Sequence, residues 1–237
     1  MAILPNDPVY DHIPALTLHI VGGGLGILSG YAAILAAKGE RMHLLFGKIF
    51  VLGMVMMATA AIWLGSMLTV LKPMELANIG MGSIILYLIS TSWMAVRRTP
   101  GTIGAFETFA LVAGAAISAT FLYWGLRAQV PGGFDGYGPT FYFVAGGIMA
   151  LFATFDLKMV VQGGVRGSAR IARHLLRMST AWFIACTSFF EGQQKSMPAA
   201  IHGSRLLLLP AFAPLGFMLF WYIRVRIVPR FRRAVPA

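Results

Sequence analysis

Long hydrophobic stretches alternate with short polar connectors along this chain. Seven of the stretches are mostly apolar over about 20 residues or more, which is the length that a helix needs to cross the hydrocarbon core of a bilayer. Short connectors rich in glycine and proline separate several of them. The pattern predicts an all-α fold: a polytopic membrane helix bundle with seven transmembrane helices in a single transmembrane domain. The predicted spans cover 13–37, 43–70, 76–96, 103–126, 141–161, 172–191 and 204–226, followed by a basic tail at 227–237.

The composition agrees with a membrane location. Of the 237 residues, 58% are hydrophobic and 11% are charged, whereas a soluble domain carries roughly 25% charged residues. The net charge of +11 does not indicate a nucleic-acid partner, because the basic residues lie between apolar stretches and not on one soluble face. Cys186 is the only cysteine, which excludes a disulfide framework. The region before the first span lacks Lys and Arg, so we expect no cleaved signal peptide.

Lys and Arg are distributed unevenly between the two sides of the predicted bundle. If the N-terminus lies outside, the inner connectors and the tail hold 13 of these residues, and the outer connectors hold 4. Cytoplasmic connectors retain positive charge, so the sequence predicts an N-out, C-in topology in a bacterial inner membrane. The expected partners are the bilayer itself, anionic lipids at the basic tail, and other membrane subunits as a further candidate.

A weak internal repeat relates the first and fifth spans. Each holds a Val-x-Gly-Gly-like segment, at 21–25 and 144–148, and each is followed by a helix that opens with His-Leu-Leu, at His43 and His174. The two segments would enter the membrane from the same side. This predicts a parallel 3+1+3 arrangement of the kind found in some transporters, with a chance similarity of common membrane residues as the alternative.

Ionisable residues inside the predicted spans need a partner or a purpose, because burying a charge in lipid is costly. Near the inner side lie two anions and two cations at similar depth, which suggests either salt bridges between helices or a proton path open to the cytoplasm. Near the outer side, Glu191 closes the sixth span. The inner residues are Lys48, Glu107, Asp156 and Arg177, with His43 and His174 beside them.

The histidines suggest a haem site. His43 and His174 each begin a helix on the inner side, and two neutral imidazoles facing one another are what a six-coordinate haem iron needs. His19 and His202 form a possible second pair near the outer side. His19 shares a helix face with Gly22, Gly26 and Gly30, and this glycine stripe equally predicts close packing of two helices. Haem b is therefore a possible cofactor.

No catalytic motif accompanies these residues. The sequence lacks a phosphate-binding loop, HExxH, CxxC and a nucleophile elbow, and the seventh span has no central lysine for a retinal Schiff base. Three functional hypotheses remain: a non-catalytic accessory or binding component, which the sequence favours; a b-type cytochrome with bis-His haem; and a small proton-coupled transporter that uses Glu107 and Asp156.

Several motifs resemble a family of uncharacterised multi-pass bacterial inner-membrane proteins, known as a domain of unknown function. The similar stretches are 42–50, 155–159, 170–178, 188–193 and 220–226. In that family an Asp-Leu-Lys/Arg motif closes one helix, Arg-His-Leu opens the next, and Phe-Phe-x-Gly-Gln closes it. The resemblance implies a shared fold and location but no activity. The residues to which it points are Asp156, Lys158, Arg173, His174, Arg177, Gly192 and Gln193.

Overall fold

The computed structural model describes residues 9–68, 75–194 and 197–228, and in this part of the chain every long element is an α-helix. One helix lies over each of the seven predicted segments, so the all-α bundle is confirmed. The rest of the basic tail, 229–237, lies outside the described residues. The helices are α1 (Val9–Leu35), α2 (Arg41–Leu68), α3 (Glu75–Arg97), α4 (Ala105–Arg127), α5 (Pro139–Val161), α6 (Gly167–Phe190) and α7 (Leu208–Ile227).

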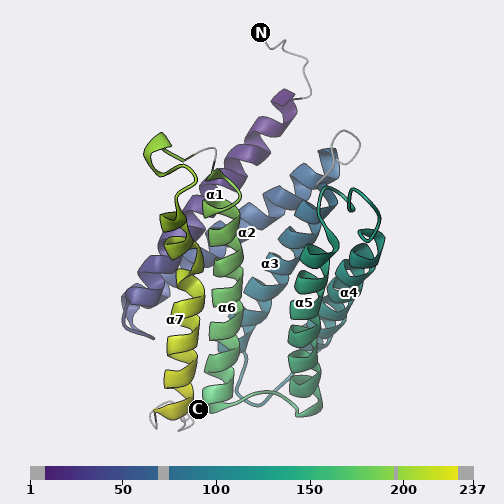
Figure 1. Ribbon diagram of the computed structural model, residues 1–237. Helices are drawn as coiled ribbons and strands as arrows, with labels where there is room; N and C mark the ends of the chain where they lie inside the picture. Colours follow the sequence, from purple (N-terminus) through teal and green to yellow (C-terminus); the bar gives the residue numbers. More distant parts are fainter. Residues whose placement is uncertain (1–8, 69–74, 195–196, 229–237) are drawn as a thin grey trace.

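Six of these helices are long and apolar enough to cross a membrane, and α6 is not among them. Its 24 residues would suffice in length, because each residue of a helix adds about 1.5 Å. Its first half is too polar, since it carries Arg170, Arg173, His174 and Arg177. Even so, α6 runs through the bundle beside α7 and α3 (Figure 1), so its polar side chains must find partners inside the protein.

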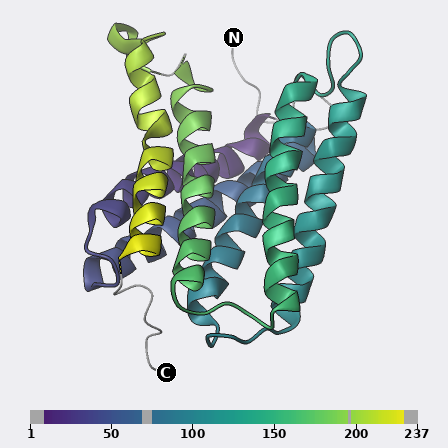
Figure 2. The same ribbon diagram turned by 60° about the horizontal axis from the view of Figure 1, so that its bottom comes forward.

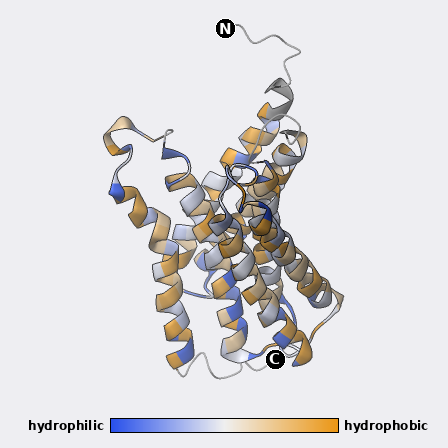
Figure 3. Ribbon diagram, turned by 45° about the vertical axis from the view of Figure 1, so that its right-hand side comes forward, coloured by the Kyte–Doolittle hydropathy of each residue, from blue (hydrophilic) through white to orange (hydrophobic). Residues whose placement is uncertain are grey.

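The helices from α3 to α7 stand roughly side by side, whereas α1 and α2 form a pair that crosses them obliquely (Figure 1, Figure 2). α1 begins at one end of the bundle and α7 finishes at the other. We call the end where α7 finishes the basic end; it also holds the connectors 36–40, 98–104 and 162–166. Hydrophobic residues dominate the middle of the helices, and hydrophilic ones gather at their ends (Figure 3).

The helix pairing does not reproduce the predicted repeat. α1 packs along α2, while α5, its expected counterpart, packs along α4 and makes few backbone approaches to α6. α3 is the central element, because it packs against α2, α4 and α6. The two three-helix segments thus have different neighbours, and the structure gives the 3+1+3 arrangement no support.

Glycines allow α1 and α2 to approach closely. A Cβ atom at Gly22 would lie 2.7 Å from the carbonyl oxygen of Gly53, and one at Gly53 would lie 2.7 Å from the carbonyl oxygen of Gly22. Farther along the same stripe, Gly26 faces Met54 and Gly30 faces the indole of Trp182. The stripe is therefore covered by protein along its length, as expected for a small-residue packing surface.

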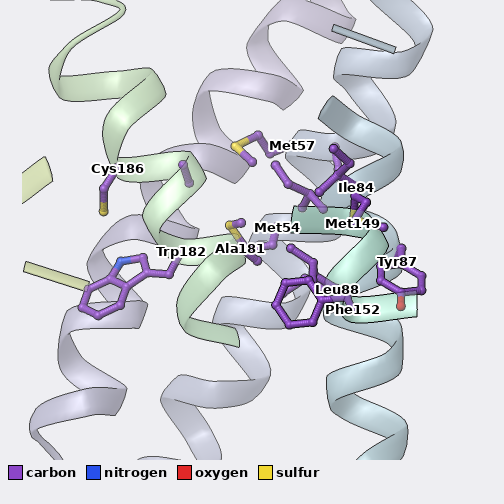
Figure 4. Packing of buried hydrophobic residues seen from close by; sticks show 14 of the residues in the cluster. Met54, Met57, Ile84, Tyr87, Leu88, Met149, Phe152, Ala181, Trp182 and Cys186 are labelled. Carbon is purple, nitrogen blue, oxygen red and sulfur yellow. The ribbon is translucent and has the colours of Figure 1, made fainter. Parts of the chain in front are cut away.

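The core lies at mid-height, where α2, α3, α5 and α6 meet (Figure 4). Met54, Leu88, Met149, Ala181 and Cys186 are fully buried there. Methionine suits this position because its unbranched side chain fills irregular gaps between helices. The lone cysteine is a buried core residue.

α7 contains an internal proline, Pro214, and a side chain of α1 replaces the hydrogen bond that this proline cannot make. Pro214 lacks the N–H group that would bond to the carbonyl of Pro210, four residues earlier. The hydroxyl of Tyr31 on α1 donates to that carbonyl oxygen at 2.6 Å. Because a free carbonyl is costly in an apolar setting, this contact stabilises the packing of α7 against α1.

Candidate functional site

Asp156 is the most deeply buried charged residue of the bundle. It lies on α5, about a turn and a half before the end of that helix, and is 0% exposed. Three side chains from two other helices bind its carboxylate. The hydroxyl of Tyr87 on α3 donates to Oδ2 at 2.5 Å, and Arg173 and Arg177 on α6 each approach Oδ1 at 2.5 Å.

Arg177 is held by more than its charge. It is 1% exposed, and its Nη1 donates to the hydroxyl of Thr91 at 2.8 Å. Its guanidinium lies 5.1 Å from the ring centre of Tyr87 and 5.0 Å from that of Phe152, so two aromatic faces stabilise the cation. We call Tyr87, Thr91, Asp156, Arg173 and Arg177 the Asp156 cluster; it joins α3, α5 and α6 and carries a net charge of +1 with the carboxylate ionised.

The arginines of α6 share one helix face. Arg166, Arg170, Arg173 and Arg177 follow one another at spacings of four, three and four residues, which places them on a single stripe. Arg170 donates to the backbone carbonyls at the end of α3, with distances of 2.7 Å to Ala95 and 3.0 Å to Arg98. The stripe therefore faces α3 and α5 and not lipid, which explains how so polar a helix fits in the bundle.

Glu107 belongs to a separate ion pair at the start of α4. Its carboxylate accepts two hydrogen bonds from Arg98, at 2.8 and 3.0 Å, and a third from the backbone N–H of Gly104 at 2.8 Å. The carboxylate thus satisfies a backbone N–H group at the start of α4, and the helix dipole stabilises its negative charge there. The sequence grouped Lys48, Glu107, Asp156 and Arg177 by depth, and of these only Asp156 and Arg177 contact each other. Lys48 is exposed on α2, and Lys158, to which the resemblance pointed, is exposed on α5.

A small pocket leads from the basic end toward the Asp156 cluster. Its walls include Arg98, Glu107, Arg170 and Arg173, and Thr91 lies at its base. The connectors above it are held together, because the N–H of Gly101 donates to the carbonyl of Val165 at 3.0 Å. The pocket has a volume of about 20 Å³, which suits a water molecule and is too small for an organic substrate.

His43 on α2 and His174 on α6 are the predicted inner pair, and the ring of each contacts a backbone carbonyl. Nδ1 of His43 is 2.9 Å from the carbonyl oxygen of Ala33, and Nδ1 of His174 is 3.2 Å from that of Ser92. These contacts leave Nε2 of each ring as the potential ligand. Histidine is absent from the lining of the small pocket beside the Asp156 cluster, and from that of a groove between α2 and α4.

The two histidines of the predicted outer pair have different surroundings. Nδ1 of His19 lies 3.0 Å from the carbonyl oxygen of Met57 and joins α1 to α2. His202 is exposed in the segment between α6 and α7. Glu191 and Gln193 are exposed at the end of α6. No group of three or more potential metal ligands occurs among residues 9–68, 75–194 and 197–228.

Sequence reasoning did not include Tyr87, Thr91, Ser92 or Arg98. Tyrosine, threonine and serine are ordinary residues in membrane helices, so nothing marks the three on α3. A usable signal was the four–three–four spacing of the α6 arginines, which requires polar partners on the neighbouring helices.

The comparisons with known proteins give no relative: the chain matches no protein-family model, and no curated protein or solved structure is significantly similar to it. The fold and the site define the class: a helical integral membrane protein, organised around a buried aspartate–arginine cluster.

Proposed function

We propose that the protein is a seven-span membrane component without catalytic chemistry of its own, serving as an accessory or binding subunit. One observation carries this. Among the described residues, the single buried side-chain nitrogen or oxygen without a hydrogen bond is Nε1 of Trp182. Members of the Asp156 cluster satisfy one another, whereas a catalytic or transport site keeps a polar group available for a substrate. The cluster therefore holds helices together.

The proposal treats α6 as the seventh span. Its 24 residues are as many as or more than those of α3, α5 and α7, and it runs beside them (Figure 1). The arginines of its stripe pair with Asp156 on α5 or donate to carbonyls at the end of α3. An odd number of spans agrees with α1 beginning and α7 finishing at opposite ends. The excess of Lys and Arg at the basic end supports a cytoplasmic location for it, in a bacterial inner membrane.

The basic tail is proposed to bind anionic headgroups. Arg224 and Arg226 lie in the last turn of α7, and three further arginines follow in the sequence. Each Lys or Arg near a membrane surface contributes about 1 kcal/mol of attraction to anionic lipid. The resemblance to the uncharacterised inner-membrane family stays a prediction that fits this picture and adds no activity.

A b-type cytochrome is the second candidate, because Nδ1 of His43 and Nδ1 of His174 each contact a backbone carbonyl, which leaves both Nε2 atoms as potential iron ligands. A proton-coupled transporter has less support, since Glu107 and Asp156 are held by different arginines.

Two measurements on the purified protein separate the three functions. Expressed with haem available, the wild type should show no Soret band, and in liposomes it should carry no proton flux above that of empty vesicles. A Soret band lost in His43→Ala and His174→Ala would favour the cytochrome and overturn the proposal. A proton flux lost in Asp156→Asn would favour the transporter.

A further inference from the structure

A lipid-facing groove runs between α2 and α4, with α3 as its floor. Its volume is about 400 Å³, within the range of roughly 300–1,000 Å³ typical of ligand sites. The lining is mainly apolar and partly aromatic. It includes Val51, Val55, Leu86, Trp93, Phe106 and Phe109.

The groove exists because α4 leans away from α2. α4 packs along α5 and only lightly against α3, and α2 packs along α1 and α3. The wall residues remain open to the surroundings: Phe109 is 70% exposed and Val55 is 38% exposed. Since the three helices are long and apolar enough to span a membrane, the groove opens into the hydrocarbon region, where acyl chains are the available occupant.

Two cations continue the groove toward the basic end. On α2, Lys48 precedes Val51 and Val55 by three and seven residues, so it lies on the same helix face. On α3, Arg97 follows Trp93 by four residues, and its guanidinium lies 4.7 Å from the centre of the Trp93 ring. Both side chains therefore extend the lining stripes of their helices.

The register of α2 against α3 brings these cations to neighbouring levels. A Cβ at Gly65 would touch Ile79, and one at Gly82 would touch Ile62. Two positions of these antiparallel helices therefore face each other when their residue numbers add up to about 144. In this antiparallel register Lys48 lies near the level of position 96, next to Arg97. A long lysine side chain on such a helix directs its amine toward the interface.

Lys48 and Arg97 lack the carboxylate partner that Arg98, Arg173 and Arg177 have. Arg98 is paired with Glu107, and Arg173 and Arg177 with Asp156. Among the described residues no ion pair involves Lys48 or Arg97, and both are exposed. Lys48 lies about 10 Å along α2 from its first residue, at 1.5 Å per residue, and near the level at which α3 ends, so one anionic headgroup can reach both cations.

We propose that this groove binds one anionic phospholipid, with an acyl chain against α2, α3 and α4 and its phosphate between Lys48 and Arg97. The apolar lining recognises the chain, and the two cations select for a headgroup with net negative charge. The site is separate from the Asp156 cluster and from the basic tail.

The test is a titration of the full chain in detergent, followed by native mass spectrometry. The probes are phosphatidylglycerol, phosphatidylcholine with the same chains, and glycerol phosphate without chains. The wild type should bind one phosphatidylglycerol about tenfold or more tightly than phosphatidylcholine, because two cations each add about 1 kcal/mol. Lys48→Gln with Arg97→Gln should remove this preference. The matched control, Lys158→Gln with Arg166→Gln, removes the same charge at the same end from two exposed positions outside the groove and should keep the preference.

A second pair of variants tests whether the acyl chain of the lipid lies in the groove. Ala113→Phe places a ring in the groove and should weaken both lipids, whereas Val112→Phe, on the neighbouring lipid-facing position, should leave binding unchanged. Equal losses in the two charge pairs would assign the preference to general surface charge and overturn the proposal. Binding of glycerol phosphate at the same affinity would show a phosphate site that needs no chain, and would overturn it as well.

Discussion

At the scale of single residues, Arg177 and Asp156 are the charges whose burial costs the fold most. A charge near the centre of a transmembrane helix costs about 2.5–3.5 kcal/mol on insertion scales, and burial without a partner raises that cost. Arg177 is tolerated because a carboxylate, a hydroxyl and two aromatic faces surround it. Removing one partner leaves the other charge buried and unpaired, which lowers the free energy of unfolding strongly. Replacing all partners with apolar side chains would change it much less.

Replacing Asp156 with Asn should destabilise the protein strongly. The change keeps the shape of the side chain but leaves Arg173 and Arg177 without a counter-charge, and loss of one partner of a buried pair costs about 3–5 kcal/mol. Unfolding of the purified protein in detergent measures this. The control Lys158→Gln, an exposed cation on the same helix, should change stability by less than about 0.5 kcal/mol.

The double variant Asp156→Leu with Arg177→Met should recover part of that loss, because it removes both members of the pair. A double variant no more stable than the sum of the two single changes would show that these residues do not act as a pair.

Gly30 should tolerate no side chain. A Cβ there would lie 2.6 Å from Nε1 of Trp182, and that indole is fixed by the edge-on ring of Tyr31 at 4.6 Å. Gly30→Ala is expected to lower stability by about 1–3 kcal/mol through overpacking. Gly24→Ala, on the same helix with open space around it, should be neutral or slightly stabilising. Equal effects of the two alanines in thermal unfolding would contradict the close contact.

At the scale of elements, the helices were predictable where apolar residues continue for a whole span. The predicted start of α6 was five residues late, at 172 instead of 167, because its arginines resemble a connector. Depth in the membrane could group Glu107 with Asp156, but it says nothing about rotation around the helix axis. The rotation of each helix about its axis determines which neighbour a side chain faces: Glu107 bonds to the start of its own helix, α4, whereas Asp156 faces α6. Partners such as Tyr87 depend on how helices pack, which one chain's hydropathy does not encode.

The connector between α4 and α5 also secures the start of α3. Oδ2 of Asp135 accepts a hydrogen bond from the backbone N–H of Ala77 at 2.8 Å. Asp135 has a φ of 48°, a left-handed conformation that asparagine and aspartate tolerate better than most residues.

Asp135→Ala should therefore lose the cap and gain strain, with a cost of about 1–2 kcal/mol. Asp135→Asn keeps an acceptor oxygen and should cost less. Hydrogen exchange at Ala77 provides the local readout, and it should accelerate in the alanine variant first. Unchanged exchange at Ala77 in the alanine variant would mean that the cap contributes nothing.

At the scale of the whole molecule, the distribution of charge is the basis of the proposed orientation. The connectors proposed to be inner and those proposed to be outer differ in Lys and Arg content, and they lie at opposite ends of the bundle (Figure 1). The sequence could therefore predict the bundle and its proposed direction from simple rules. It could not predict the oblique α1–α2 pair, which depends on the contact of Gly22 with Gly53.

Cysteine labelling tests the orientation directly. In a Cys186→Ala background, Gln129→Cys between α4 and α5 should react with a membrane-impermeant maleimide on intact cells. Gln162→Cys between α5 and α6 should react only after permeabilisation. Both positions are exposed, so access is decided by the side of the membrane. The reverse labelling pattern would invert the topology.

The arginine stripe of α6 has a consequence for biogenesis. A helix with several arginines partitions poorly from the insertion machinery into lipid by itself. Its partners on α3 and α5 all precede it in the chain: Tyr87 and Thr91, the carbonyls at the end of α3, and Asp156. They are synthesised before α6 emerges from the ribosome. The order of the sequence thus allows earlier helices to receive α6 as it enters the membrane, so its insertion becomes a folding step guided by the nascent protein.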